Sequence, residues 1–159
     1  MRTNYDLLKF AEKYNIPLNN IVNKDNLKYE NITQGGWIVN MEDSVDSRGN
    51  FTPGTHWVSF YVKGNKCVYF DSFGILPDIQ IQKILCQYIP YRYSTKQIQN
   101  IRNGDCGDFC LFFIFFISRS TKSLDEALLD FQRLFSNNTA QNKQILVNLL
   151  KKYNLWYLK

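Results

Sequence analysis

Two short, mostly apolar segments on either side of a polar turn in the middle of the chain predict a β-hairpin. Two segments rich in β-branched and aromatic residues, which favour strands, run from His56 to Val62 and from Lys66 to Phe70. Only three residues, Lys63 to Asn65, separate them, a length typical of a tight hairpin turn.

The position of the loop within this turn decides how His56 and Asp71 face each other. With Lys63-Gly64 as the loop, His56 lies directly across from Asp71, with about 5 Å between Cβ atoms. With Gly64-Asn65 as the loop, the two residues are diagonal neighbours about 7–8 Å apart. The sequence leaves both registers open, and both place the two side chains on one face of the sheet.

Helical periodicity predicts elements on both sides of the hairpin. Helices are predicted from Asn4 to Tyr14, after Pro77 through Ile79, Ile81, Ile84, Leu85 and Tyr88, from Leu124 onward, and from about Thr139 to Tyr153. Thr3 is suited to cap the first of them, and Ser123-x-x-Glu126 matches a capping box. A short apolar run, Trp37 to Met41, is either a strand or a loop that lines a cleft. The loop from Glu42 ends in the turn signal Pro53-Gly54, and residues 89–93 are expected to be extended.

Cys106 lies three residues before an apolar segment, FCLFFIFFI at 109–117, which periodicity alone cannot assign to a strand or a buried helix. The acidic residues Asp105 and Asp108 favour a helix N-terminus here. The order of elements is then helix, hairpin, helix, strand and further helices. This order predicts a single α+β domain over residues 1–159.

Composition agrees with one globular domain. The chain has 159 residues, of which 45% are hydrophobic and 21% charged, and this balance argues against disorder. The net charge is +5, and the basic residues are not clustered in a tight run. This charge is a mild indication of contact with a polyanion, and an ordinary solvated surface is the alternative interpretation.

The longest apolar run, Phe109 to Ile117, is about half of a membrane span. The N-terminus lacks the apolar core of a signal peptide. We therefore expect a soluble, intracellular protein.

The number and spacing of the cysteines, together with the single histidine, limit which disulfide, metal and thiol chemistry is possible. Without a secretion signal, the four cysteines are expected to stay reduced. A metal site is not expected, because the chain has one histidine and no Cys-x-x-Cys pair. Cys67 and Cys110 are expected to be buried and inert, and Cys86 lies on a predicted helix. No cofactor is expected to be needed for the chemistry.

A nucleophilic thiol needs a base and a donor for the oxyanion. Cys106 lies at a predicted helix N-terminus, where the helix dipole stabilises a thiolate. His56 is the only histidine, so any Cys–His catalysis must use it. Asp71 beside it would fix the tautomer of the imidazole and stabilise its cation. The competing interpretation is a half-buried strand histidine without a chemical role.

Three segments resemble the His, acid and Gln-to-Cys boxes of the adenovirus maturation proteases (adenains) and of the related proteases that deconjugate SUMO. They are GTHWVSFYV at 54–62, YFDSFG at 69–74 and QNIRNGDCGDFC at 99–110. The resemblance runs from about Gly54 to Ile117. It implies a papain-like α+β fold of the adenain/SUMO-protease type, with a central mixed sheet flanked by helices, and peptide hydrolysis through a thioester.

The resemblance also implies roles for residues. Cys106 would be the nucleophile, His56 the general base and then acid, and Asp71 its orienter. Gln99 would donate to the oxyanion beside the backbone N–H of Cys106, and Gln97 is the rival donor.

The spacing between Gln99 and Cys106 is seven positions, which resembles the adenovirus branch. Deconjugating enzymes usually have six, a place that Asn100 takes here. The acid Asp71 and the triplet Asp105-Cys106-Gly107 look more like the deconjugating branch.

Two residues stand directly after candidate catalytic residues: Trp57 follows His56, and Gly107 follows Cys106. Trp57 resembles a tryptophan beside the active site, which implies substrate binding, and a core aromatic on a strand is an equally good interpretation. Gly107 is expected to permit close approach to the backbone behind the nucleophile.

The resemblance extends to partners and activators. It implies cleavage after Gly-containing motifs, of capsid precursors in a virus or virus-like element, by a monomer in a virion or in the host cytoplasm or nucleus. It also implies stimulation by DNA and by a peptide joined through a disulfide, for which Cys86 is the candidate. The alternatives are a processing or deconjugating protease for a ubiquitin-like modifier, and a basic domain that binds nucleic acid or a partner without catalysis.

Overall fold

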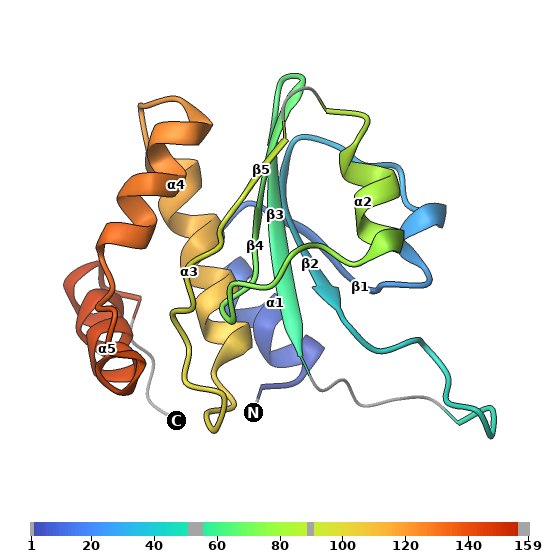
Figure 1. Cartoon of the computed structure of the whole chain (residues 1–159), viewed down its shortest axis with the longest axis horizontal. Coiled ribbons are helices and arrows are strands. Elements are labelled where there is room, and N and C mark those ends of the chain that lie inside the picture. The colour runs from blue at the N-terminus through green and yellow to red at the C-terminus, as the bar shows by residue number, and fades with distance from the viewer. Residues whose placement is uncertain (1, 51–55, 89–90, 156–159) are drawn as a thin grey trace.

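A mixed β-sheet with both faces buried organises the fold (Figure 1). The structure is a computed structural model that describes residues 2–50, 56–88 and 91–155. In this part of the chain the strands lie in the order β1 to β5: Leu18–Asn23, Gly35–Asn40, Trp57–Lys63, Lys66–Phe70 and Tyr91–Tyr93. The outer pairs β1–β2 and β4–β5 are parallel, and the two inner pairs are antiparallel.

Helices cover both faces of this sheet, which confirms the predicted α+β class. The α-helices are α1 (Asn4–Lys13), α2 (Ile79–Leu85), α3 (Cys106–Arg119), α4 (Leu124–Arg133) and α5 (Asn142–Lys152), with short 3₁₀ helices η1 (Leu27–Tyr29) and η2 (Thr139–Gln141). Figure 1 shows α3, α4 and α5 on one side of the sheet and α2 on the other. Side chains of α1, α3, α4 and α5 share one core with the sheet, while η1 and α2 close a second.

The apolar segment after Cys106 is a helix because it is covered on several sides. α3 packs on the sheet and against both α1 and α4. A helix in this position buries nearly its whole circumference, which explains why its sequence shows no polar face. The contact with β2 is so close that a Cβ at Gly36 would lie 2.4 Å from Cγ2 of Ile114.

The hairpin adopts the second of the two registers that the sequence left open. Lys63 pairs with Lys66 and Ser59 with Phe70, so Gly64-Asn65 is the loop. Gly64 has φ +65°, a conformation that glycine adopts without strain. His56 and Asp71 are therefore diagonal neighbours, just beyond the ends of β3 and β4.

Most predicted boundaries hold within a few residues. Thr3 caps α1 through a reciprocal pair with Asp6, and the Ser123 hydroxyl accepts the Glu126 N–H at the start of α4. The predicted helix after Pro77 is shorter than expected, since it ends at Leu85. The last predicted helix begins with a 3₁₀ turn.

The run Trp37 to Met41, predicted as either a strand or a cleft-lining loop, lies mostly in the strand β2. The strand β1 was not predicted, because three of the six residues in its sequence LNNIVN are asparagine, which strands disfavour. The predicted Pro53-Gly54 turn lies outside the described residues. No helix of the described part combines the length and apolar character that crossing a bilayer requires.

Candidate active site

The fold brings together three residues that are far apart in sequence. Cys106 is the first residue of α3 and is 2% exposed. His56 immediately precedes β3, and Asp71 immediately follows β4. The hairpin register therefore places His56 and Asp71 at one end of the sheet. α3 packs against β3, and its first residue lies within interaction range of His56.

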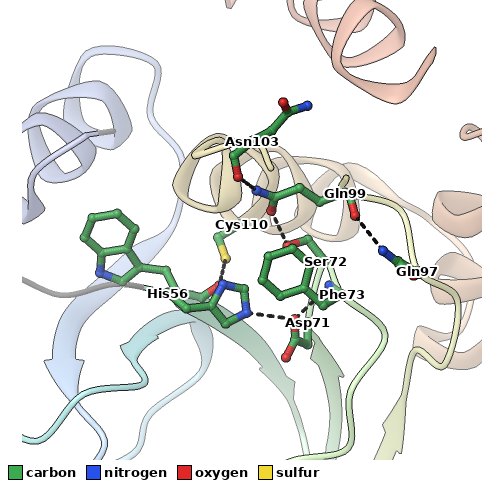
Figure 2. Close-up of polar contacts among 9 residues, drawn as sticks. His56, Asp71, Ser72, Phe73, Gln97, Gln99, Asn103 and Cys110 are labelled. Carbon is green, nitrogen blue, oxygen red and sulfur yellow. Dashed lines mark hydrogen bonds and ion pairs between the residues drawn. The ribbon is translucent and has the colours of Figure 1, made fainter. Parts of the chain in front are cut away.

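The His56 imidazole is held by Asp71 and Phe73 (Figure 2). Its Nε2 lies 2.9 Å from Oδ1 of Asp71, and the Phe73 N–H donates to the same oxygen at 2.8 Å. The Phe73 ring stacks on the imidazole with centroids 4.4 Å apart and planes 19° apart. These contacts fix both the position of the ring and its tilt.

The hydrogen bond to Asp71 determines the tautomer. A carboxylate only accepts hydrogen bonds, so Nε2 of His56 carries a proton. The other nitrogen, Nδ1, is buried and has no well-aligned hydrogen bond within the described residues. It is thus the ring nitrogen left to exchange a proton with the Cys106 thiol.

Electrostatics favour a protonated imidazole. Burial alone lowers the pKa of His56, because it disfavours the cation. Hydrogen bonding and charge interactions with Asp71 and Cys106 outweigh burial and raise the pKa from 6.5 to about 9. An imidazolium between a carboxylate and a thiolate is the arrangement that cysteine nucleophiles use.

The first turn of α3 supplies backbone donors. The N–H groups at the start of a helix have no intrahelical acceptor, and the N–H of Cys106 is the first of them. Asp105 precedes the helix without capping it through its side chain, and its Oδ2 lies 3.5 Å from Nζ of Lys143. Arg2 pairs with Asp108 in the same turn. These cations offset the charge of the two carboxylates that flank Cys106 in the sequence.

Gln99 is buried on the loop that leads to α3, with 1% of its surface exposed. Its Oε1 accepts from the Ser72 hydroxyl at 2.6 Å, and its Nε2 donates to the Asn103 carbonyl. One amide N–H remains for another acceptor. Gln97, the rival donor, is exposed and donates instead to the backbone carbonyl of Gln99.

Trp57 packs against Gly107, the residue that follows Cys106. Trp57 is 1% exposed, which favours its interpretation as a core aromatic, and substrate contact stays a prediction. A Cβ at Gly107 would lie 3.0 Å from Cδ2 of Leu7 and 3.5 Å from Cε3 of Trp57. The close approach predicted at this glycine is therefore observed.

All four cysteines are free thiols. Cys67 and Cys110 are buried, as predicted, and burial raises the pKa of both. Cys86 is exposed at the end of α2. Within residues 2–50, 56–88 and 91–155, no group of three or more His, Cys, Asp and Glu side chains is placed to hold a metal ion.

The sequence did not single out Ser72 or Phe73. Both lie within the segment YFDSFG that carries Asp71. A serine and a phenylalanine after a strand are too common to indicate a role. The signal that could have found Phe73 is the second hairpin register, which places it opposite His56.

No protein-family model and no curated protein matches this chain. Among solved structures it is similar to the ASFV pS273R protease, with a TM-score of 0.51 at 16% identity over 99% of this chain and 66% of that one. A selenomethionine structure of the same protease gives a TM-score of 0.45 at 17% identity, over 83% of this chain and 66% of that one. The first match shows a shared fold, and this chain spans about two thirds of the length of that protease.

Proposed function

We propose that this chain is a cysteine endopeptidase in which Cys106 is the nucleophile, His56 its base and then acid, and Asp71 the orienter of His56. The observation that carries the proposal is the His56 imidazole, bonded to Asp71 through Nε2 and within interaction range of the Cys106 thiol. The fold shared with the ASFV protease supports it further.

The chemistry follows from these positions. The Cys106 thiolate attacks the carbonyl carbon of the scissile peptide, and the carbonyl oxygen becomes an oxyanion. The N–H of Cys106 and the free amide N–H of Gln99 stabilise that charge. Nδ1 of His56 then gives its proton to the leaving nitrogen as the C–N bond breaks and a thioester forms. Water attacks the thioester, His56 takes a proton from it, and the thiolate is released.

The proposed substrates are proteins cut after Gly-containing motifs. The resemblance to adenains favours maturation of capsid precursors in a virus or virus-like element, and the fold shared with a protease from ASFV supports proteolysis. The resemblance of Asp71 and the Asp105-Cys106-Gly107 triplet to deconjugating enzymes favours a second candidate, processing of a ubiquitin-like modifier. Cleavage of capsid precursors compared with cleavage of modifier fusions separates the two.

The direct test is hydrolysis of a fluorogenic Gly-Gly peptide by the wild type and by Cys106→Ala. We expect the variant to lose cleavage while keeping native circular dichroism. Cys67→Ala is a matched control, because it also removes a buried thiol. Full activity in Cys106→Ala would refute the proposal.

A limiting dose of iodoacetamide separates the enzyme from a non-catalytic binding domain. The experiment uses a Cys86→Ser background, because Cys86 is exposed and would react first. Mass spectrometry should then find alkylation at Cys106 well ahead of Cys67 and Cys110. A binding domain would show no preferred thiol.

A further inference from the structure

We infer that Ser72 is a positioning residue that orients the side-chain amide of Gln99 as an oxyanion donor. The inference rests on the proposed function, since it assigns a role within that site. It begins from the two contacts of the Gln99 amide: the Ser72 hydroxyl donates to Oε1 at 2.6 Å, and Nε2 donates to the Asn103 carbonyl. Figure 2 shows the amide between these two partners.

The two contacts allow only one orientation of the amide. If the amide were rotated by half a turn, Oε1 would face the Asn103 carbonyl, and two acceptors cannot bond. The Ser72 hydroxyl supplies the donor that the correct orientation needs at Oε1. Without it, Oε1 would be a buried acceptor without a partner, and the amide would gain alternative positions.

Ser72 is suited to this role because it is fixed and hidden. It is 0% exposed, so its hydroxyl has no water to bond. It follows Asp71, so the same short segment orients both the base and the oxyanion donor. Gly74, two residues later, has φ +71°, and a Cβ there would lie 2.8 Å from the backbone at Lys96 and Gln97. The segment is therefore pressed against the loop that carries Gln99.

The backbone of that loop is held independently of the Ser72 hydroxyl. The N–H groups of Ile98 and Gln99 both donate to the Ser72 carbonyl at 2.9 Å. Asn142, fully buried at the start of α5, donates to the Ile98 carbonyl at 2.8 Å. Replacing Ser72 by alanine removes none of these bonds. It therefore releases the Gln99 amide without moving the loop.

The test compares peptide hydrolysis with alkylation in Ser72→Ala. Iodoacetamide reacts with the thiolate by displacement and forms no oxyanion, so its rate reports the Cys106–His56 pair alone. We expect kcat on the Gly-Gly peptide to fall about 5- to 10-fold, the effect of one lost hydrogen bond, with KM and the alkylation rate unchanged. The control is Ser94→Ala, which removes another buried hydroxyl, one without a hydrogen-bond partner among the described residues.

A double variant makes the test specific to Gln99. If Ser72 acts through Gln99, adding Ser72→Ala to Gln99→Ala should lower kcat no further. If Ser72→Ala fails to fold, Ser72→Cys retains a weak donor and gives the same comparison through kcat, with a smaller loss expected.

Three outcomes would overturn the inference. One is wild-type kcat in Ser72→Ala, and another is an additive loss in the double variant. The third is a parallel fall in hydrolysis, alkylation and melting temperature, which indicates a structural role only. If the wild type shows no hydrolysis that depends on Cys106, the proposed function fails and this inference fails with it. Normal hydrolysis in Ser72→Ala refutes the inference alone.

Discussion

His56 and Phe73 lie ring on ring, with centroids 4.4 Å apart and planes 19° apart. They face each other because the hairpin pairs Ser59 with Phe70, and three further residues along each chain bring His56 opposite Phe73. The Phe73 N–H also bonds the carboxylate that holds His56. One residue thus supports both the imidazole and its acid.

This stacking predicts a change in pH dependence for Phe73→Leu. The variant keeps the backbone N–H to Asp71 but removes an aromatic face, whose attraction for a cation is worth about 1 kcal/mol. The imidazolium should lose its proton at lower pH, so the alkaline limb of the activity profile should move down by about 0.5–1 pH unit. Phe73→Tyr, which keeps the ring, is the control. An unchanged limb in Phe73→Leu would show that the stack does not support the cation.

The raised pKa of His56 can be measured directly, because no other histidine overlaps its NMR signals. The titration midpoint should lie near pH 9 in the wild type. In Asp71→Asn it should fall, because the carboxylate charge that opposes the effect of burial is gone. Hydrolysis should fall as well, but less than in His56→Ala, if Asp71 mainly orients the ring. A midpoint near 6.5 in the wild type would contradict the proposed charge arrangement.

The same shift predicts how stability depends on pH. The pKa of His56 is about 9 in the folded state and 6.5 when unperturbed, so folding takes up a proton between these values. The contribution is complete below pH 6.5 and is lost as pH rises through 9, and it amounts to at most about 3 kcal/mol. Urea unfolding at pH 6 and pH 10 should show this loss in the wild type and not in His56→Gln. Equal losses in both proteins would assign the effect to other groups.

Replacing Gln99 and replacing Gln97 should have opposite effects on activity. Removing an oxyanion donor lowers kcat about 10²–10³-fold in other enzymes, and we expect this for Gln99→Ala. Gln97→Ala should keep its activity, because Gln97 is exposed and its amide donates to the backbone carbonyl of Gln99. Both variants are compared with the wild type by kcat and melting temperature. The reverse result would show that the resemblance was aligned to the wrong glutamine.

The hairpin and α3 could be predicted because their signals are local. Strand-forming residues on both sides of Lys63-Gly64-Asn65 define the hairpin, and acidic residues before an apolar run mark the start of α3. The register could not be predicted, since both loops fit the same three residues. It is decided by pairing along whole strands.

Other features depend on tertiary contacts that no local pattern carries. β1 has asparagine at three of its six positions and is a strand because it pairs in parallel with buried β2. Ser72 is inconspicuous in sequence, since its partner Gln99 lies 27 residues away. The single histidine made His56 easy to select, whereas the core position of Trp57 depends on α3, whose Gly107 lies against the Trp57 ring.

The close approach of α3 to β2 predicts a large effect for Gly36→Ala. The added Cβ would lie 2.4 Å from Cγ2 of Ile114, so the helix or strand must shift, at a cost of about 1–3 kcal/mol of unfolding free energy. Urea unfolding measures this cost. In an Ile114→Ala background the clash is absent, and the same substitution should cost much less. Equal costs in both backgrounds would place the effect in the β2 backbone instead.

The resemblance to adenains predicts activation by DNA and by a peptide linked through Cys86. Cys86 is an exposed free thiol at the end of α2, so a peptide could reach it. However, Figure 1 shows α2 across the sheet from α3, so an attached peptide would begin on the far face from Cys106. The net charge of +5 favours polyanion contact without defining a site.

The decisive measurement is Gly-Gly peptide hydrolysis with and without DNA at two salt concentrations, in the wild type and in Cys86→Ser. If phosphate contacts drive activation, DNA should raise the rate at low salt and lose its effect steeply as salt is added. Cys86→Ser should respond to DNA as the wild type does, because its thiol has no part in phosphate binding. Stimulation by a cysteine-containing peptide should disappear in that variant. Equal rates under all conditions would show a protease that needs neither activator.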